Sequence, residues 1–275
     1  MTREYGLCIW TFGDISLEEK CRLAKEIGVN GVEVQGDLKQ DPCKLASLLE
    51  KYGLKVLSVT PDNVDISSIN EDSRQKAVQY FLDLLSWARD LGANRICLHG
   101  EVGKIVGCGD PDKDWKLLVE STKTVMEKAE ALQIEVVFEV LNRYENHQIV
   151  TAKEALRLID AVNSPNLLVL LDAYHMNIEE SNPAVALRTA GKKLGVYHVA
   201  DSNRQAIGNG HANIKDQVEA LQEINYSGPI IMEMTAEGPN PFTPVKGENY
   251  LQAVINYYKT SLEKLKAMEY SKSVI

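Results

Sequence analysis

The sequence predicts one α/β domain, covering residues 1–275, folded as a (β/α)8 TIM barrel. Eight strand-like apolar runs alternate strictly with eight helix-like segments, and no Pro/Ser-rich linker or change of composition divides them. Strict alternation indicates a parallel sheet with covered faces, and eight units in roughly 250 residues is the number that closes a TIM barrel. An open doubly wound sheet is the alternative. It is weakened because no Gly-x-Gly-x-x-Gly turn follows the first strand.

The first half of the chain repeats one pattern three times: a helix, a glycine at its C-terminal end, and a β-branched run. Ser16 and Glu19 form a capping box that opens the first helix, which ends at Gly28. The second and third helices end at Gly53 and Gly92, where a positive φ is free of strain. We therefore expect strands at about 6–10, 31–35, 54–60 and 95–100, with helices at about 17–27, 43–52 and 70–91.

The same alternation continues to the end of the chain. Helices are expected at about 114–132, 151–162, 183–190, 213–224 and 249–268, and strands at about 136–139, 167–172, 195–200 and 229–233. The last helix carries apolar and aromatic side chains that fit packing on its own barrel or on a neighbouring copy, which leaves a homo-oligomer open.

Charge and composition restrict the partners. A net charge of -9 and a pI near 5.2 argue against nucleic acid or an anionic membrane, because phosphate-backbone binding needs a basic face. No apolar run approaches the ~18 residues of a membrane span, and no signal region is visible, so we expect a cytoplasmic protein. The 5 cysteines include no Cys-x-x-Cys, which fits reduced thiols rather than disulfides or a structural zinc site.

Four consecutive predicted strands end in metal-ligating residue types: Glu139, Asp172, His198 and Glu233. Taken singly, each could be a helix cap or a core histidine. In a TIM barrel, however, the C-terminal strand ends meet at one mouth, and burying carboxylates there is costly unless a cation faces them. Three oxygen ligands and one nitrogen suit one divalent ion, Mn²⁺ first, with Co²⁺, Mg²⁺ or Fe²⁺ as alternatives.

Three stretches around these positions closely resemble the ketose 3-epimerase family, which includes the D-tagatose and D-psicose 3-epimerases among the xylose-isomerase-like TIM barrels. The stretches are Phe-Glu-Val-Leu-Asn-Arg-Tyr-Glu at 138–145, Leu-Asp-Ala-Tyr-His-Met-Asn-Ile-Glu-Glu at 171–180, and His-Val-Ala-Asp-Ser-Asn-Arg at 198–204. The resemblance implies a metal-dependent isomerase that inverts C3 of a free ketose. It also implies that the four strand-end residues are the metal ligands.

The resemblance further implies a role for each remaining site residue. Glu139 and Glu233 would act as acid and base through a cis-enediolate, while Glu145, His175 and Arg204 would hold substrate hydroxyls. Two carboxylates on opposite faces of the substrate are the minimum apparatus for moving a proton from one face of C3 to the other. From the residues alone, Arg204 could instead form a loop salt bridge with Glu145 or Asp201.

Alternatives remain for the substrate. The loop at 99–108 lacks the aromatic residues expected there in the tagatose and psicose enzymes. A sugar-phosphate epimerase, a hydroxypyruvate isomerase or an inosose enzyme would use the same kind of barrel. A non-catalytic sugar-binding barrel is the alternative from another class, although a binder needs no matched pair of glutamates.

Overall fold

The computed structural model describes residues 3–240 and 242–270, which contain eight strands in one parallel sheet. The strand order is β3-β2-β1-β8-β7-β6-β5-β4. Consecutive strands pair with each other except β3 and β4, which stand at the two ends of this order, and β8 pairs with β1. The strands are β1 Tyr5–Cys8, β2 Gly31–Gln35, β3 Lys55–Thr60, β4 Arg95–Leu98, β5 Glu135–Glu139, β6 Leu167–Asp172, β7 Leu194–Val199 and β8 Ile230–Met232.

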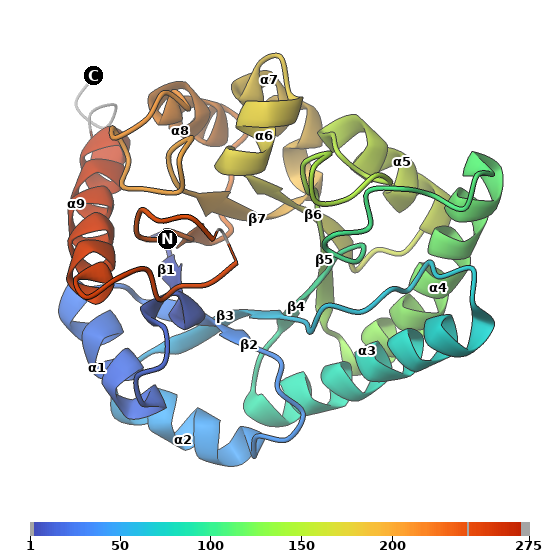
Figure 1. Cartoon of the computed structure of the whole chain (residues 1–275), viewed down its shortest axis with the longest axis horizontal. Helices are drawn as coiled ribbons and strands as arrows, with labels where there is room; N and C mark the ends of the chain where they lie inside the picture. The colour runs from blue at the N-terminus through green and yellow to red at the C-terminus, as the bar shows by residue number, and fades with distance from the viewer. Residues whose placement is uncertain (1–2, 241, 271–275) are drawn as a thin grey trace.

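The sheet curls into a nearly closed barrel, as Figure 1 shows. Strands β3 and β4 form the two edges that face each other. A side chain bridges them: Arg95 Nη1 donates a hydrogen bond to the Leu57 carbonyl at 3.1 Å, while its Nη2 pairs with Glu135 at 2.6 Å. The (β/α)8 barrel predicted from the alternation is therefore confirmed.

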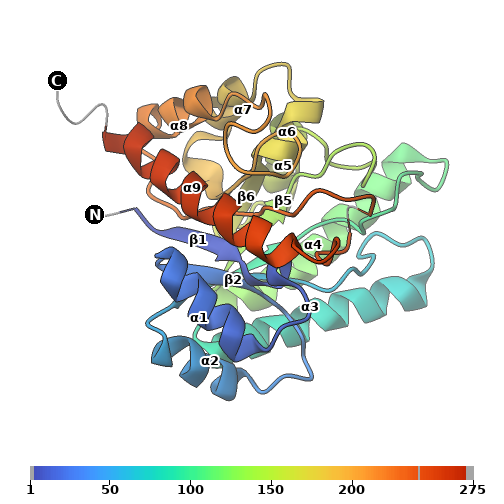
Figure 2. The same ribbon diagram turned by 60° about the vertical axis from the view of Figure 1, so that its left-hand side comes forward.

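Helices surround the barrel, and α9 crosses its outside between α8 and α1 (Figure 2). Val254, Tyr258 and Leu262 of α9 are buried in the chain's own core, so this helix packs on its own barrel. None of the helices in the described residues is long and apolar enough to cross a membrane. The helices are α1 Leu17–Ile27, α2 Pro42–Lys51, α3 Glu71–Leu91, α4 Pro111–Leu132, α5 Ala152–Val162, α6 Ala173–Glu179, α7 Pro183–Ala190, α8 Ile214–Glu223 and α9 Tyr250–Tyr270.

The predicted helix boundaries have clear local causes. The Ser16 hydroxyl accepts a hydrogen bond from Glu19 N at the start of α1, and Gly28 ends the helix with a φ of 93°. Gly92 ends α3 in the same way, with a φ of 82°. Three short elements were not predicted: helix α6, the 3₁₀ helix Gly191–Lys193, and the 3₁₀ helix Ile9–Phe12 that ends the first strand at Cys8.

A small apolar layer fills the barrel interior, and the inward-facing residues that follow it in each strand lie at the C-terminal mouth. Seven strands each contribute one buried side chain, and Gly31 of β2 completes the layer because a Cβ there would lie 2.8 Å from Leu57 Cγ. Since alternate residues of a regular strand face the same side, the residues two positions beyond Cys97, Val137, Leu170, Val196 and Ile231 also point inward, at the C-terminal mouth. In β3 the register shifts, and Thr60 instead of Val59 lines the inner side. The seven side chains are Cys8, Leu57, Cys97, Val137, Leu170, Val196 and Ile231.

Candidate active site

The four predicted metal ligands follow this interior layer and meet at the mouth. Glu139 and Asp172 end β5 and β6, His198 lies in β7 opposite Asp172, and Glu233 comes directly after β8. One ligand atom from each residue lies within 4.8 Å of the corresponding atoms of the other three. The structure thus brings together the whole set that the strand ends predict.

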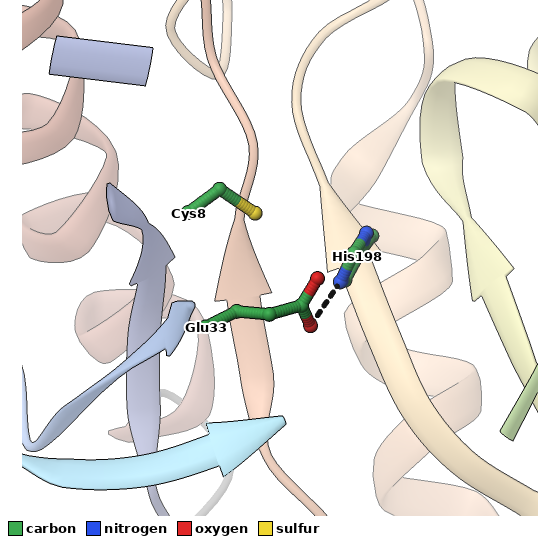
Figure 3. A group of neighbouring side chains, drawn as sticks. All are labelled: Cys8, Glu33 and His198. Atoms are coloured by element: carbon green, nitrogen blue, oxygen red, sulfur yellow. Dashed lines mark hydrogen bonds and ion pairs between the residues drawn. The ribbon is translucent and has the colours of Figure 1, made fainter. Parts of the chain in front are cut away.

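His198 is oriented by a residue that the sequence reasoning missed. Its Nε2 lies 3.0 Å from Glu33 Oε2, and both side chains are buried, at 2% and 0% exposure (Figure 3). A carboxylate oxygen accepts, so Nε2 carries the hydrogen, and Nδ1 has a free lone pair once the ring loses its second proton. Nδ1 is buried without a hydrogen-bond partner among the described residues. It lies 3.6 Å from Glu233 Oε2 and 3.9 Å from Glu139 Oε1.

This orphaned nitrogen tests whether a metal fits the residues. A buried imidazole nitrogen without a partner is costly unless it is a ligand, and an imidazole whose other nitrogen donates to a carboxylate is the usual arrangement of a metal-bound histidine. The donor set of three carboxylates and one imidazole is the one that hard divalent ions prefer. The residues therefore fit a divalent cation between Glu139, Asp172, His198 and Glu233.

A second group, Cys8, Glu33 and His198, also gathers ligand atoms within 4.8 Å. It is a weaker candidate. Burial, followed by the negative charge of Glu33, raises the pKa of the Cys8 thiol well above its usual value, whereas a ligand needs the thiolate. Glu33 is already engaged, because its two oxygens accept hydrogen bonds from Thr60 Oγ1 and from His198 Nε2.

The two catalytic candidates experience different electrostatic environments. Burial raises the pKa of Glu139 to about 8, helped by the nearby carboxylates of Glu233 and Asp172 and opposed by His198. Burial would also raise the pKa of Glu233, but the positive charges of Arg204 and His198 outweigh it and hold that pKa well below its usual range. Neighbouring carboxylates whose pKa values are driven apart are typical of acid/base pairs.

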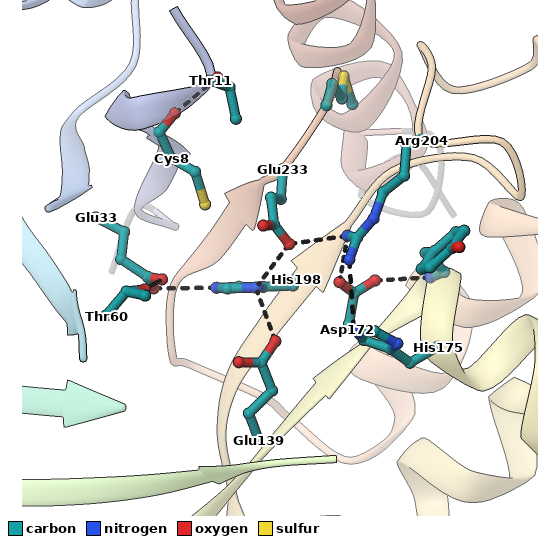
Figure 4. Close-up of polar contacts among 12 residues, drawn as sticks. Cys8, Thr11, Glu33, Thr60, Glu139, Asp172, His175, His198, Arg204 and Glu233 are labelled. Carbon is teal, nitrogen blue, oxygen red and sulfur yellow. Dashed lines mark hydrogen bonds and ion pairs between the residues drawn. The ribbon is translucent and has the colours of Figure 1, made fainter. Parts of the chain in front are cut away.

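Arg204 lies between two of the metal-ligand candidates (Figure 4). Its Nη1 donates to Asp172 Oδ2 at 2.6 Å and to Glu233 Oε2 at 2.8 Å, and its guanidinium stacks 4.2 Å above the ring of Tyr174. The salt bridge with Glu145 or Asp201 that the sequence left open is not among the ion pairs of the described residues. Arg204 therefore faces the site and not the outer loop.

His175 is buried beside Arg204, and hydrogen-bond donors face both of its ring nitrogens. The backbone N–H of Asn142 donates to His175 Nδ1 at 3.2 Å, and the Asn142 amide nitrogen lies 2.8 Å from the same atom. Arg204 Nη2 lies 3.3 Å from His175 Nε2, and burial lowers the pKa of the ring. Asn142 Nδ2 also donates to Glu145 Oε1 at 2.9 Å, which links two predicted substrate residues through an asparagine that the sequence reasoning had not singled out.

The site opens into a cavity of about 760 Å³. Its lining includes Glu139, Glu233 and all three predicted substrate residues, Glu145, His175 and Arg204. Residues from the opposite half of the barrel mouth, such as Trp10 and His99, line the other side. The volume is in the range of small-molecule sites.

Comparisons with known proteins agree with this arrangement. The family model of the xylose isomerase-like TIM barrel matches residues 21–266. The D-psicose 3-epimerase of Ruminiclostridium cellulolyticum is 37% identical over 175 residues, which is 62% of this chain and 59% of that protein. The chain thus aligns with less than two thirds of that relative's length. The 3-dehydro-D-guloside 4-epimerase of Escherichia coli is 28% identical over 232 residues, covering 81% of this chain and 88% of that protein.

Solved structures give the same fold. The crystal structure of a D-allulose 3-epimerase from Methylomonas sp. in complex with D-allulose matches with a TM-score of 0.85 and 27% identity, and the match covers 97% of each chain. The similarity to ketose 3-epimerases expected from the three sequence stretches is confirmed. The chain belongs to the xylose isomerase-like TIM barrel family.

Proposed function

We propose that the protein is a divalent-metal-dependent epimerase that inverts C3 of a free ketose. The observation that carries this proposal is the placement of Glu139 and Glu233 on opposite sides of the His198 ring at the cavity floor (Figure 4). Their side chains keep 11% and 19% exposure, so both carboxylates can reach a molecule in the cavity. Two carboxylates facing one position from two sides suit proton removal from one face and delivery to the other.

Glu139, Asp172, His198 and Glu233 would hold one divalent cation, with Mn²⁺ favoured and Co²⁺, Mg²⁺ or Fe²⁺ as alternatives. When bound, the cation supplies Lewis-acid stabilisation to the oxygens at C2 and C3. The carboxylates of the site carry the proton chemistry.

One glutamate takes the proton from C3, and the electron pair of that bond spreads to the C2 carbonyl oxygen, which gives an enediolate. The other glutamate, which must carry a proton when the ketose is bound, delivers that proton to the opposite face of C3, and the carbonyl forms again. Atoms and charge balance, because one carboxylate gains the proton that the other loses. The two residues exchange roles in the reverse direction, as microscopic reversibility requires.

The remaining predicted residues supply matched contacts to the sugar. Arg204 presents N–H donors to the cavity and Glu145 presents acceptor oxygens, and the His175 ring lines the same cavity. A sugar hydroxyl can serve as partner to either type. Holding the substrate in one orientation is what allows each carboxylate to reach only one face of C3.

The cavity favours a free sugar over a sugar phosphate. Four carboxylates line it, from Glu139, Glu145, Glu233 and Glu237, against the two cationic side chains of Arg204 and Lys246. Even with the proposed cation balancing Glu139 and Glu233, Glu145 and Glu237 offset Arg204 and Lys246, so the lining offers a phosphate dianion no excess of positive side chains. The phosphorylated substrate that the sequence left open is therefore the weaker proposal.

Isotope exchange tests this function directly. The protein is incubated with Mn²⁺ and D-fructose, D-allulose, D-tagatose or L-ribulose in deuterated water, and the sugars are followed by NMR. Deuterium at C3 together with formation of the C3 epimer is the expected result. Exchange only at C1, or no exchange with any ketose, would contradict the 3-epimerase proposal.

A second candidate is a 4-epimerase acting on a 3-keto sugar, favoured by the extended match to the E. coli 3-dehydro-D-guloside 4-epimerase. The same two glutamates would serve, because the C4 proton next to a C3 carbonyl is as acidic as the C3 proton next to a C2 carbonyl. Deuterium at C4 of a 3-keto glycoside, with none at C3 of a ketose, would select this activity.

A further inference from the structure

His99 lies at the same level of the barrel mouth as the proposed metal ligands but has no role in the mechanism above. Cys97 belongs to the interior layer of the barrel, so His99, two residues further on, also points inward. Leu98 of β4 pairs with Phe138 of β5, which puts His99 level with Glu139 on the next strand. The His99 side chain is only 5% exposed and lines the cavity.

The hydrogen bonds of His99 define its tautomer. Its Nδ1 is hydrogen-bonded to the Gly100 carbonyl, and a carbonyl can only accept, so Nδ1 carries the hydrogen. Burial lowers the pKa of His99, although the charge of Glu145 opposes this, and the ring is therefore neutral. Nε2 is then an acceptor, and it has no hydrogen-bond partner among the described residues.

The two cavity histidines differ in what occupies Nε2. Arg204 Nη2 already lies 3.3 Å from Nε2 of His175, whereas Nε2 of His99 offers a free lone pair, because its Nδ1 donates to Gly100. A buried acceptor that faces a cavity needs a donor when water is displaced. In a sugar, the available donor is a hydroxyl group.

The position of His99 indicates which part of the sugar it meets. The proposed ligands and the residues assigned to the reacting carbons belong to β5 to β8 or to the loops that follow them, whereas His99 follows β4. The cavity extends from the metal-ligand group past His99 to Thr60 and Trp10 on the β1 to β4 side. A chain anchored at C1 to C3 therefore directs its later carbons toward His99.

We propose that Nε2 of His99 accepts a hydrogen bond from one hydroxyl of the ketose beyond C3, which makes His99 a specificity residue for a hydroxylated distal end. This inference rests on the proposed function, because it takes the reacting carbons to lie at Glu139 and Glu233. It concerns a contact of this chain's own side chain and not the chemistry at C3. A deoxy analogue would leave Nε2 buried and unpaired in the complex.

Measuring each enzyme variant with each substrate analogue tests the proposed hydrogen bond at Nε2 of His99. D-fructose is compared with its 4-deoxy, 5-deoxy and 6-deoxy analogues, in the wild type, in His99→Phe and in His99→Gln. One deoxy analogue should lose about tenfold in kcat/KM with the wild type, the size of one hydrogen bond with a buried partner. His99→Phe should abolish that preference, and His99→Gln, whose amide oxygen accepts, should retain part of it.

His147→Leu is the matched control, because it removes another partly buried histidine, one that does not line this cavity. It should keep the wild-type preference among the analogues. The proposal is overturned if His99→Phe discriminates among all three analogues as the wild type does. Thermal unfolding shows whether His99→Phe folds. If it does not, His99→Gln and His99→Leu replace it, and the proposed contact is overturned if both variants discriminate among the analogues as strongly as the wild type.

Calorimetry of sugar binding to the Mn²⁺-loaded protein separates this proposal from the proposed function. The contact is supported if the wild type binds one deoxy analogue more weakly than D-fructose and the His99→Phe variant does not. This result supports the contact even if deuterium never appears at C3. Conversely, C3 exchange with no analogue dependence on His99 supports the epimerase and overturns the contact. The two proposals can therefore fail independently.

Discussion

Glu33 Oε2 lies 3.0 Å from Nε2 of His198, and this contact determines which nitrogen of His198 faces the other three ligand candidates. Thr60 donates to the second oxygen of Glu33, so the carboxylate is held from both sides. Without the contact, the ring could present either nitrogen, or rotate away from Glu139 and Glu233. Glu33 thus acts on the proposed metal site through the ring of His198.

We expect removal of this contact to weaken metal binding without removing a ligand. Glu33→Ala should lower Mn²⁺ affinity about 10- to 100-fold, the usual effect of losing the partner of a ligating histidine. Glu33→Gln, which keeps an acceptor oxygen but loses the charge, should lie between the wild type and Glu33→Ala. Titration calorimetry with Mn²⁺ measures both. Wild-type affinity in Glu33→Ala would show that His198 needs no such orientation.

Replacing either proposed acid/base residue should stop proton transfer at C3. Glu139→Gln and Glu233→Gln should each reduce deuterium incorporation by about 10²- to 10⁴-fold, because a glutamine cannot exchange the proton. The rates are compared at saturating Mn²⁺, so that weaker metal binding does not account for the loss. Glu237→Gln is the matched control, since this exposed glutamate lines the same cavity and should retain near wild-type exchange. Full activity in Glu233→Gln would exclude it from the mechanism.

Metal binding should release a proton from Glu139. Its pKa rises from 4.5 to about 8 in the fold, so between these values the folded metal-free protein holds a proton that the unfolded chain has lost. This group therefore makes the metal-free fold less stable as the pH rises through that window. A cation requires the ionised carboxylate, so binding at pH 6.5 should expel the proton.

Calorimetry of Mn²⁺ binding at pH 6.5, in two buffers of different ionisation enthalpy, counts the protons released. Glu139→Gln should release about one proton fewer than the wild type. His198 should release a proton on metal binding in both proteins. Its burial lowers its pKa, but Glu33 and Glu233 outweigh this effect and raise the pKa well above the usual value. Equal proton release in the two proteins would mean that Glu139 is already ionised before the metal binds.

Arg204 should stabilise the metal-free site and become less important for stability once a cation is bound. Arg204→Met leaves Asp172 and Glu233 without their shared partner, and the loss of one member of a buried ion pair costs about 3–5 kcal/mol. Added Mn²⁺ should therefore raise the thermal midpoint of this variant more than that of the wild type.

Arg188→Met is the control, since it breaks an exposed pair with Glu223 worth only about 0–1 kcal/mol. Its thermal midpoint should respond to Mn²⁺ as the wild type does. An equal response in Arg204→Met would indicate that the guanidinium does not neutralise the two carboxylates.

The barrel and its four strand-end ligand candidates were predictable because both depend on periodicity. Alternating helix and strand patterns indicate the number of units, and the last inward residue of each strand follows from its apolar run. Glu33 follows the same rule and was still missed. A carboxylate between two valines in a strand covered on both faces has to be buried, and that signal was available in the sequence.

Other features depend on tertiary structure that periodicity does not encode. Helix α6 begins directly at Asp172, so its start was hidden by a residue already assigned to the metal site. The direction of Arg204 depends on its loop, where the residue adopts a φ of 61°. Nothing in the residue order distinguishes this conformation from one that would point the guanidinium at Asp201. The tautomer of His99 likewise follows from a carbonyl that only the fold places beside it.

Asp172 joins two functions in a single side chain. One oxygen caps α6 by accepting from Tyr174 N at 2.6 Å, and the other accepts from Arg204. His175 belongs to the first turn of that helix, so a residue proposed to contact the sugar is anchored to a proposed metal ligand by one carboxylate. Asn is the replacement that can keep the cap while removing the charge. We expect change at this position to be doubly constrained, because altering the proposed metal ligand also disturbs the helix that carries His175.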